Sequence, residues 1–300
     1  MSITEDRTIW LVGDGRSGTT WVCDLINHRQ RYRELFEPFH PQYVDEARTL
    51  APNKYFRAEQ GDGPFTDFVS KILAGNIDNP RVNPRAGESQ SDFAGILVKD
   101  IFANLAIFAA YRNFPGIKPI LLIRNPFAVA YSKYIKRHWS WVVNPLFLLK
   151  QPMLMHDHLS QYKGLIERIH REQNYFLNLI LIWAVIHYVP LRQFRSHEIH
   201  VCFYESMFRD PRTEIEAIFR YLGEQTGIDK SIFTEAFSRT PSRTSGKANS
   251  LGSEGGPILE WQNRLPQALI EKGKALLSEF NLDALYTDDG LPNPDALWPQ

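Results

Sequence analysis

The chain has 300 residues, of which 43% are hydrophobic and 13% aromatic, enough to build one large α/β domain. Its 34 basic and 34 acidic residues give a formal charge of zero, which excludes an overall electrostatic attraction to nucleic acid or to an anionic membrane. The two cysteines, Cys23 and Cys202, lie in apolar segments, so a secreted disulfide framework is not expected. We therefore expect a single domain over residues 1–300.

The chain reaches its first apolar run at residue 8, which leaves no room for a basic-then-apolar signal sequence or an anchor helix. Residues 164–190 have helical spacing, but their apolar run is interrupted by charge, and we expect one long core helix there. From these features we expect no transmembrane segment and a cytoplasmic protein.

Apolar runs typical of buried parallel strands recur along the chain and alternate with helical patterns. They lie at residues 8–12, around 33–36, and at 95–99, 118–123 and 199–203. This order predicts an α/β fold, a doubly wound sheet of about five mainly parallel strands with helices on both faces, similar to that of P-loop NTPases.

A glycine-rich turn follows the first strand, where residues 13–21 read Gly-Asp-Gly-Arg-Ser-Gly-Thr-Thr-Trp. Glycines let the backbone approach an anion, and the start of the next helix offers unpaired N–H groups and the positive end of its dipole. The spacing matches a Walker A loop, but Thr19 stands where that loop has its lysine, and the cation is Arg16. This turn therefore predicts a site for an anionic nucleotide.

A second anion site is predicted after the fourth strand, where Arg124-Asn125-Pro126 opens a helical stretch that contains Ser132. An arginine at the end of a strand and a serine two helical turns later can both face one phosphate. The blander alternative is that the glycine turn is only a tight connection and that Arg124 pairs with a surface acid.

With both motifs present and in this order, the chain resembles sulfotransferases that use 3′-phosphoadenosine 5′-phosphosulfate (PAPS). The resemblance implies that the first loop binds the 5′-phosphosulfate through Gly15, Arg16, Ser17, Gly18, Thr19 and Thr20. It implies that Arg124 and Ser132 bind the 3′-phosphate. Residues 201–207, with Tyr204-Glu205, are similar to the family's strand that ends in Tyr-Glu-Asp-Leu.

The same resemblance suggests how the rest of the nucleotide is held. Trp21 and Tyr204 are candidates to border the adenine, and Ser245, Gly246 and Lys247 would close over the 3′-phosphate, with Arg243 as an alternative cation. We expect residues 242–256, rich in Ser and Gly, to form a mobile cofactor loop. Trp261 is expected to pack in the core.

Sulfuryl transfer needs a cation at the leaving oxygen, donors for the sulfuryl oxygens and a base for the acceptor's proton. Arg16 is the candidate cation, assisted by Lys99 or Lys247, and the amides of residues 17–20 are the candidate donors. No metal is required.

The base is predicted from a second resemblance, because the Lys-Thr-His pattern of phenol and steroid sulfotransferases reads Lys99-Asp100-Ile101 here. Residues 35–40 instead look like the Tyr-Glu-Pro segment of the carbohydrate and tyrosylprotein branches, which makes Glu37 the predicted base. We expect burial between Phe36 and Phe39 to raise its pKa.

Three other readings of this region stay open. Glu37 is alternatively a surface glutamate, His40 is the reserve base because its ordinary pKa is near neutral, and Asp100 serves as a base or only caps a helix beginning near Ile101.

The acceptor is the least determined partner. Residues 139–160 are predicted to form a lid or acceptor segment, because the stretch is aromatic and apolar yet interrupted by prolines at 145 and 152. The resemblance at Glu37 favours a hydroxyl on a carbohydrate, glycolipid or small metabolite, so we expect a small-molecule, glycan or lipid acceptor. Core packing or a homodimer contact is the alternative use of this stretch.

The sequence leaves one metal-like motif and two other functions to weigh. We interpret His156-Asp157-His158 as a solvated loop, because no acidic or cysteine partner follows at metal-like spacing. The alternatives to a sulfotransferase are a P-loop kinase of a small metabolite and a non-catalytic nucleotide-binding protein.

Overall fold

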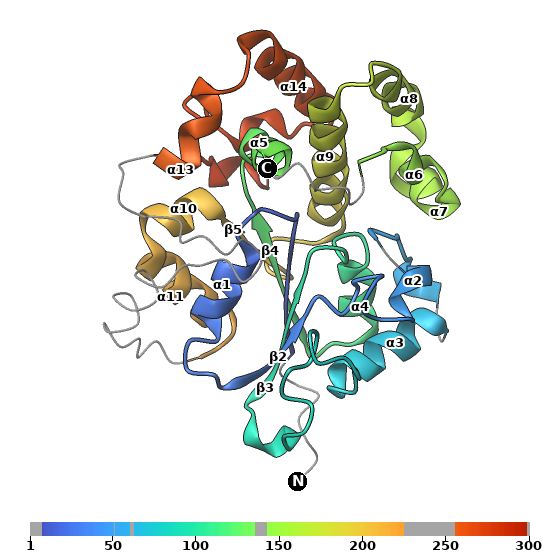
Figure 1. The fold of residues 1–300 in the computed structure, drawn as a ribbon, viewed down its shortest axis with the longest axis vertical. Coiled ribbons are helices and arrows are strands. Elements are labelled where there is room, and N and C mark those ends of the chain that lie inside the picture. The colour runs from blue at the N-terminus through green and yellow to red at the C-terminus, as the bar shows by residue number, and fades with distance from the viewer. Residues whose placement is uncertain (1–7, 51, 61–62, 136–142, 225–255, 299–300) are drawn as a thin grey trace.

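Five parallel strands form one sheet at the centre of the computed structural model, which describes residues 8–50, 52–60, 63–135, 143–224 and 256–298 (Figure 1). The strand order is β2-β3-β1-β4-β5. The strands are β1 (Thr8–Gly13), β2 (Tyr32–Phe36), β3 (Gly95–Asp100), β4 (Ile117–Ile123) and β5 (His200–Phe203). The predicted doubly wound sheet is confirmed, and every predicted strand lies within one residue of its observed bounds.

Helices surround the sheet. They are α1 (Thr19–Ile26), α2 (Ala47–Leu50), α3 (Pro64–Leu73), α4 (Ile107–Asn113), α5 (Pro126–Ile135), α6 (Leu146–Leu149), α7 (Pro152–Leu154), α8 (Lys163–Arg171), α9 (Tyr175–Gln193), α10 (Tyr204–Arg209), α11 (Pro211–Tyr221), α13 (Gly256–Leu259) and α14 (Gln267–Glu279). Of these, α1, α4, α10 and α11 contact the strands of the sheet, whereas α14 packs on α9. Short 3-10 turns occupy η1 (Ala58–Gln60), η2 (Gln90–Asp92), η4 (Ser160–Tyr162), η5 (Glu260–Asn263), η6 (Asp283–Leu285) and η7 (Pro294–Ala296), and η3 (Met155–Leu159) is a π-helical turn.

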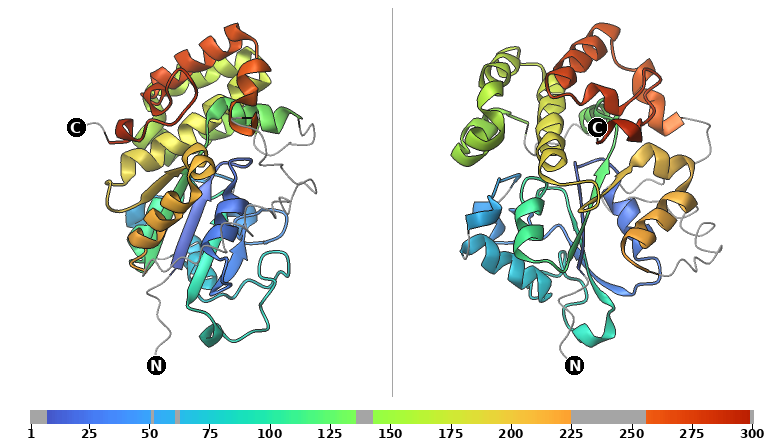
Figure 2. Two further views of the ribbon diagram at one scale, coloured as in Figure 1. Left: turned by 90° about the vertical axis from the view of Figure 1, so that its left-hand side faces the viewer. Right: turned by 180° about the vertical axis from the view of Figure 1, so that it is seen from behind.

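The sheet buries both faces, because side chains alternate along each strand. In β1, Trp10 and Val12 join the larger core with α3, α4, α5, α9 and α14, whereas Ile9 and Leu11 join a second core with α1, α10 and α11. Figures 1 and 2 show α1, α10 and α11 on one side of the sheet and α2, α3 and α4 on the other. Burial on both faces explains why the strands are continuous apolar runs in the sequence.

The strand order places the ends of β1 and β4 side by side at the point where the chain reverses its direction of winding. After β1 the chain moves toward β2 at one edge, and after β4 it moves toward β5 at the other. The two strands are in register at Val12 with Leu121 and at Gly13 with Leu122. In open α/β sheets such a switch point is where ligands bind, beyond the carboxyl ends of the strands.

The prediction of one long helix over residues 164–190 is wrong, because the structure has two helices there, α8 and α9. The chain breaks at Gln173, whose φ is +50°, and Asn174 then caps α9 by accepting hydrogen bonds from the amides of Phe176 and Leu177 at 3.0 and 3.2 Å. By length and composition α9 could cross a membrane, but 78% of its most apolar window is buried inside the protein. It is therefore a core helix, as expected for this stretch.

The described part of the predicted lid segment is helical, contrary to our expectation that its prolines would prevent regular structure. Pro145 is the N-cap of α6 and Pro152 is the first residue of α7, positions that a proline's missing N–H tolerates. Leu148, Leu154 and Leu159 are fully buried. Part of the apolar character of this stretch thus comes from packing, and residues 139–142 lie outside the described part of the chain.

Gly273 of α14 lets this helix pack closely against α5 and α9. A Cβ atom at position 273 would lie 2.4 Å from Cε1 of Phe127 and 3.0 Å from Cδ1 of Ile180. Alanine would gain about 1 kcal/mol of helix propensity, but overpacking costs about 1–3 kcal/mol. We therefore expect Gly273→Ala to lower the free energy of unfolding in a urea titration.

The matched control is Gly164→Ala in α8, where an added Cβ meets no atom within 4 Å. This variant should be as stable as the parent protein or slightly more stable. Equal stability changes in the two variants would contradict the packing argument.

Candidate functional site

The loop between β1 and α1 is shaped to hold an anion. Arg16 and Gly18 have positive φ values of 74° and 90°, and the amide of Ser17 donates to the carbonyl of Asp14 at 3.1 Å. A Cβ atom at Gly18 would lie 2.5 Å from the ring of Tyr204, so this position requires glycine both for its φ and for space. Alternating backbone conformations of this kind turn successive N–H groups toward one point.

Unused donors remain at the start of α1. The amide of Val22 donates to the carbonyl of Gly18 at 3.1 Å, so earlier amides of the first turn, including those of Thr19 and Thr20, have no acceptor within the helix. The hydroxyl of Ser17 is fully buried and has no hydrogen-bond partner among the described residues. An anion at this position would satisfy these groups and face the positive end of the helix dipole.

The second predicted anion site meets the first. Nη1 of Arg124 donates to the carbonyl oxygen of Arg16 at 2.9 Å, and Nε of Arg16 donates to Oγ of Ser132 at 3.1 Å. Burial lowers the pKa of Arg16, and the nearby Arg124 lowers it further. The two positively charged guanidinium groups repel one another. The arrangement therefore favours a negatively charged ligand beside them.

Buried groups hold the Arg-Asn-Pro turn in place. The carboxylate of Glu205, which is fully buried, accepts hydrogen bonds from the amide of Asn125 at 2.9 Å and from the hydroxyl of Tyr286 at 3.1 Å. The indole of Trp183 donates to the carbonyl of Arg124 at 3.0 Å. The sequence offered a signal for Glu205, since it follows Tyr204 in the segment that resembles the family's Tyr-Glu-Asp-Leu strand end, although both residues begin α10 here. It offered none for the role of Trp183.

The two aromatic residues predicted near the adenine lie together beside the loop. The rings of Trp21 and Tyr204 meet edge to face with their centroids 5.8 Å apart. The guanidinium carbon of Arg124 lies 4.3 Å from the centroid of the Tyr204 ring. One face of Tyr204 is thus covered by Arg124. The predicted contacts of Ser245, Gly246 and Lys247, and the loop at 242–256 apart from its last residue, fall outside the described residues.

Glu37 and Lys99, predicted to act in catalysis, form a buried ion pair at the ends of β2 and β3. Oε1 of Glu37 lies 2.5 Å from Nζ of Lys99, and Oε2 lies 3.2 Å from Nη2 of Arg81. Glu37 has a φ of +56°, a rare conformation for a residue other than glycine, and its amide donates to the carbonyl of Lys99 at 2.6 Å. Strained backbone of this kind often occurs at functional sites.

The expectation that Glu37 has a raised pKa is wrong in direction. Burial acts to raise the pKa, but the charges and hydrogen bonds of Lys99 and Arg81 outweigh it, and the net pKa is lowered. The alternative of a surface glutamate is also wrong, since Glu37 is 4% exposed. Arg81 was missed by sequence reasoning, because it lies 44 residues further along the chain.

His40 and Asp100, the alternative bases, do not have the properties expected from the sequence. Burial lowers the pKa of His40 to about 4, so its near-neutral pKa is not retained. Asp100 accepts hydrogen bonds from the amides of Phe39 and Phe102, both at 2.7 Å. It therefore fastens the Glu37 loop to the end of β3, and it does not cap a helix near Ile101, because α4 begins at Ile107.

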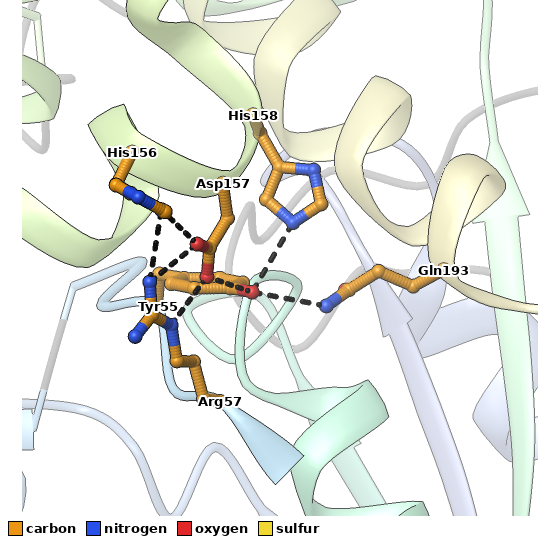
Figure 3. Close-up of polar contacts among 6 residues, drawn as sticks. All are labelled: Tyr55, Arg57, His156, Asp157, His158 and Gln193. Atoms are coloured by element: carbon orange, nitrogen blue, oxygen red, sulfur yellow. Dashed lines mark hydrogen bonds and ion pairs between the residues drawn. The ribbon is translucent and has the colours of Figure 1, made fainter. Parts of the chain in front are cut away.

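The His156-Asp157-His158 motif belongs to the π-helical turn η3 and not to a solvated loop. Figure 3 shows the carboxylate of Asp157 facing Arg57, and the hydroxyl of Tyr55 at the centre of the group. Tyr55 donates to Oδ2 of Asp157 at 3.1 Å, and Nε2 of His158 lies 3.2 Å from the same hydroxyl. Arg57 holds the pKa of Asp157 well below its usual range. Within the described ranges, no three His, Cys, Asp or Glu side chains group as metal ligands.

This network fastens the α7–η3 segment to the loop around residue 53, which in turn contacts the Asp100 region. Gln151 accepts a hydrogen bond from the amide of Tyr55 at 2.9 Å and donates to the carbonyl of Asn53 at 3.1 Å. The amide of Asn53 donates to the carbonyl of Phe102 at 2.8 Å. The predicted acceptor segment is thus connected to the Glu37 loop through the side chains of Gln151 and Asp100 and one backbone hydrogen bond at Asn53.

Asp100 should make stability depend on pH. Burial raises its pKa to about 7, above the ordinary value of 3.8, so its contribution to stability is fully present below pH 3.8 and is lost as the pH rises through about 7. We expect the parent protein's advantage over Asp100→Asn, measured by urea unfolding, to be larger at pH 4.5 than at pH 7.5. Asp283→Asn, at an exposed position, should show no such trend. An advantage that grows with pH would contradict this assignment.

Comparisons with known proteins identify the family of this chain. A family model described as the sulfotransferase domain matches residues 6–279. The sulfotransferase domain of the Synechococcus PCC 7002 olefin synthase is 16% identical, with 93% of this chain and 96% of that chain aligned and a TM-score of 0.51. The sulfotransferase domain from the curacin biosynthetic pathway is also 16% identical, with 90% and 96% aligned and a TM-score of 0.50.

A mouse sulfotransferase, SULT7A1, solved in complex with PAP, is 14% identical, with 92% of this chain and 85% of that chain aligned and a TM-score of 0.47. A search among curated proteins found no significant match. At such identities the solved structures bear on the fold alone, whereas the family model covers nearly the whole sequence. The chain therefore belongs to the sulfotransferase family and is an enzyme of sulfuryl transfer.

Proposed function

We propose that this enzyme takes its sulfuryl group from PAPS and transfers it to a hydroxyl of a carbohydrate, glycolipid or small metabolite. The observation that carries the proposal is the contact between the two anion sites, in which Arg16 touches both Arg124 and Ser132. A nucleotide that is anionic at both ends of its ribose matches two such sites beside one another.

The residues present fit this donor. The buried Ser17 hydroxyl has no partner among the described residues, and it lies with the amides of the first turn of α1 at the end expected to hold the 5′-phosphosulfate. Arg124 and Ser132 would hold the 3′-phosphate by a charge-assisted fork and a hydroxyl. When bound, the nucleotide supplies the sulfuryl group and leaves as the bisphosphate.

Arg16 and Lys99 are proposed to stabilise the charge that develops during transfer. Arg16 lies in the loop itself, and Lys99 is 2% exposed, so its ammonium acts where water screens it little. Because Nζ of Lys99 lies 2.5 Å from Oε1 of Glu37, Lys99 also orients the proposed base.

Glu37 is proposed to accept the proton of the acceptor hydroxyl, with His40 as the reserve. A carboxylate with a lowered pKa is ionised at neutral pH and orients a hydroxyl well, although it is a weak base for a free alcohol. We infer that it receives the proton late, after bond formation to sulfur has made the hydroxyl acidic. Arg81 and Lys99 would keep the carboxylate in one orientation until then.

The remaining features of the enzyme are also proposals. We expect one domain over residues 1–300, a cytoplasmic location, an acceptor that is a small molecule, a glycan or a lipid, and a role of residues 139–160 in acceptor binding. The homodimer contact stays an alternative for part of that segment.

The first test is transfer of labelled sulfate from PAPS to a panel of hydroxyl acceptors, with calorimetric titration of 3′-phosphoadenosine 5′-phosphate (PAP) and of ATP. We expect sulfate transfer without added Mg²⁺ and tighter binding of PAP than of ATP. Phosphate transfer from Mg-ATP would instead support a kinase, and tight PAP binding without transfer to any acceptor would support a nucleotide-binding protein.

The Glu37→Gln variant tests the base within the same assay. It should lower turnover by about 10²-fold or more, because the proton acceptor is lost, while PAP affinity stays within about threefold. Glu279→Gln, at an exposed position of α14, is the matched control. Full turnover in Glu37→Gln would reject this residue as the base and leave the donor assignment intact.

A further inference from the structure

A buried ion pair lies next to both proposed phosphate sites. Nζ of Lys133 lies 2.6 Å from Oδ1 and 2.7 Å from Oδ2 of Asp14, and the two side chains are 4% and 8% exposed. Asp14 follows the last residue of β1 and opens the anion-binding loop, while Lys133 follows Ser132 in α5. The pair therefore joins the two chain segments that carry the two sites.

We propose that the Asp14–Lys133 pair is a positioning element that fixes the distance between the 5′ and 3′ anion sites, so that one bisphosphate nucleotide engages both. This inference rests on the proposed function, because it presupposes a donor with two anionic ends. Neither residue is proposed to touch the nucleotide.

Polar contacts join the loop to the β4–α5 segment, among them Asp14 with Lys133, Arg16 with Ser132, and Arg124 with the carbonyl of Arg16. The last two use Arg16, Arg124 and Ser132, whose donors must also serve the phosphates. The Asp14–Lys133 contact does not compete with the ligand and can persist in both free and bound states. It is thus the contact best suited to keep the spacing constant.

Electrostatics supports a role beyond simple cohesion. A carboxylate at the start of an anion site would repel a phosphosulfate, and Lys133 neutralises it by contacting both carboxylate oxygens. Replacing a buried ion pair by apolar residues is often neutral or stabilising for folding, so stability alone does not account for a pair at this position.

Residues of α9 contact the Arg124 turn and lie near the Asp14–Lys133 pair. Trp183 donates to the carbonyl of Arg124, and His187, one turn later, is fully buried with its Nδ1 2.7 Å from the carbonyl of Trp183. Burial lowers the pKa of His187 to about 4, and the nearby charges of Asp14 and Lys133 act on this pKa in opposite directions. The pair thus lies in a packed, dry environment where a change of side chain alters geometry.

The test compares three ligands by calorimetry: PAP, adenosine 5′-phosphate and adenosine 3′-phosphate. The parent protein should prefer PAP over either monophosphate by about 10²-fold or more, because both sites act together. In Lys133→Met, PAP affinity should fall by about tenfold, ~1.4 kcal/mol, and by more than the affinity for either monophosphate. The uncompensated Asp14 carboxylate should weaken adenosine 5′-phosphate binding in part, while the affinity for adenosine 3′-phosphate should change by less than about threefold. Lys133→Arg, which keeps the charge but changes the reach, should lose part of the preference.

The double variant Asp14→Asn/Lys133→Met separates spacing from charge. It removes both charges, so continued loss of the PAP preference supports a positioning role, whereas full recovery would show that the pair only neutralises Asp14 and would overturn the proposal. The control is Lys274→Met, which breaks a 2.6 Å ion pair on the surface and should leave the preference unchanged.

The proposed donor and the proposed positioning role would be rejected by different results. A parent protein without any preference for PAP rejects the proposed donor. A parent preference that survives in Lys133→Met and in Lys133→Arg, or equal losses for all three ligands, rejects the positioning role alone.

Discussion

The contact of Arg16 with both Arg124 and Ser132 is the interaction on which the rest of the site depends. It exists because β1 and β4 are neighbours in the sheet and send their chains in opposite directions, so that the turns after them face one another. Local sequence makes each turn a candidate anion site, through glycine and a helix start in one case and through an arginine and a serine in the other. Topology makes them one site.

The acceptor end of the site follows a different principle. Glu37 is held in a left-handed backbone conformation and between two cations, so that its orientation is fixed and its pKa is lowered. Lys99 and Arg81 hold this carboxylate in one orientation, and they also make it a weaker base. Asp100, the Asn53 region and Gln151 form a continuous set of contacts from this loop to α7, which connects the predicted acceptor segment to the proposed base.

Much of the fold could be predicted from the sequence, because strands buried on both faces are continuous apolar runs and the glycine turn marks the end of the first one. Arg124 and Ser132 could also be proposed as a pair from the sequence, since their spacing of two helical turns lies within one segment. Ion pairs between residues far apart in the sequence were missed: Lys133 is 119 residues from Asp14, and Arg81 is 44 residues from Glu37. The prediction of a raised pKa for Glu37 was wrong for this reason, because its contacts with Arg81 and Lys99 form only in the folded chain. The break between α8 and α9 was missed because helical spacing continues across it, although Asn174 is a common N-cap residue.

The most direct test of the central claim is a crystal structure of the enzyme with PAP. The account predicts the 5′-phosphate on residues 15–20 at the start of α1, and the 3′-phosphate within hydrogen-bonding distance of both the Arg124 guanidinium and the Ser132 hydroxyl. A nucleotide bound elsewhere, or one whose 3′-phosphate points away from Arg124 and Ser132, would contradict it.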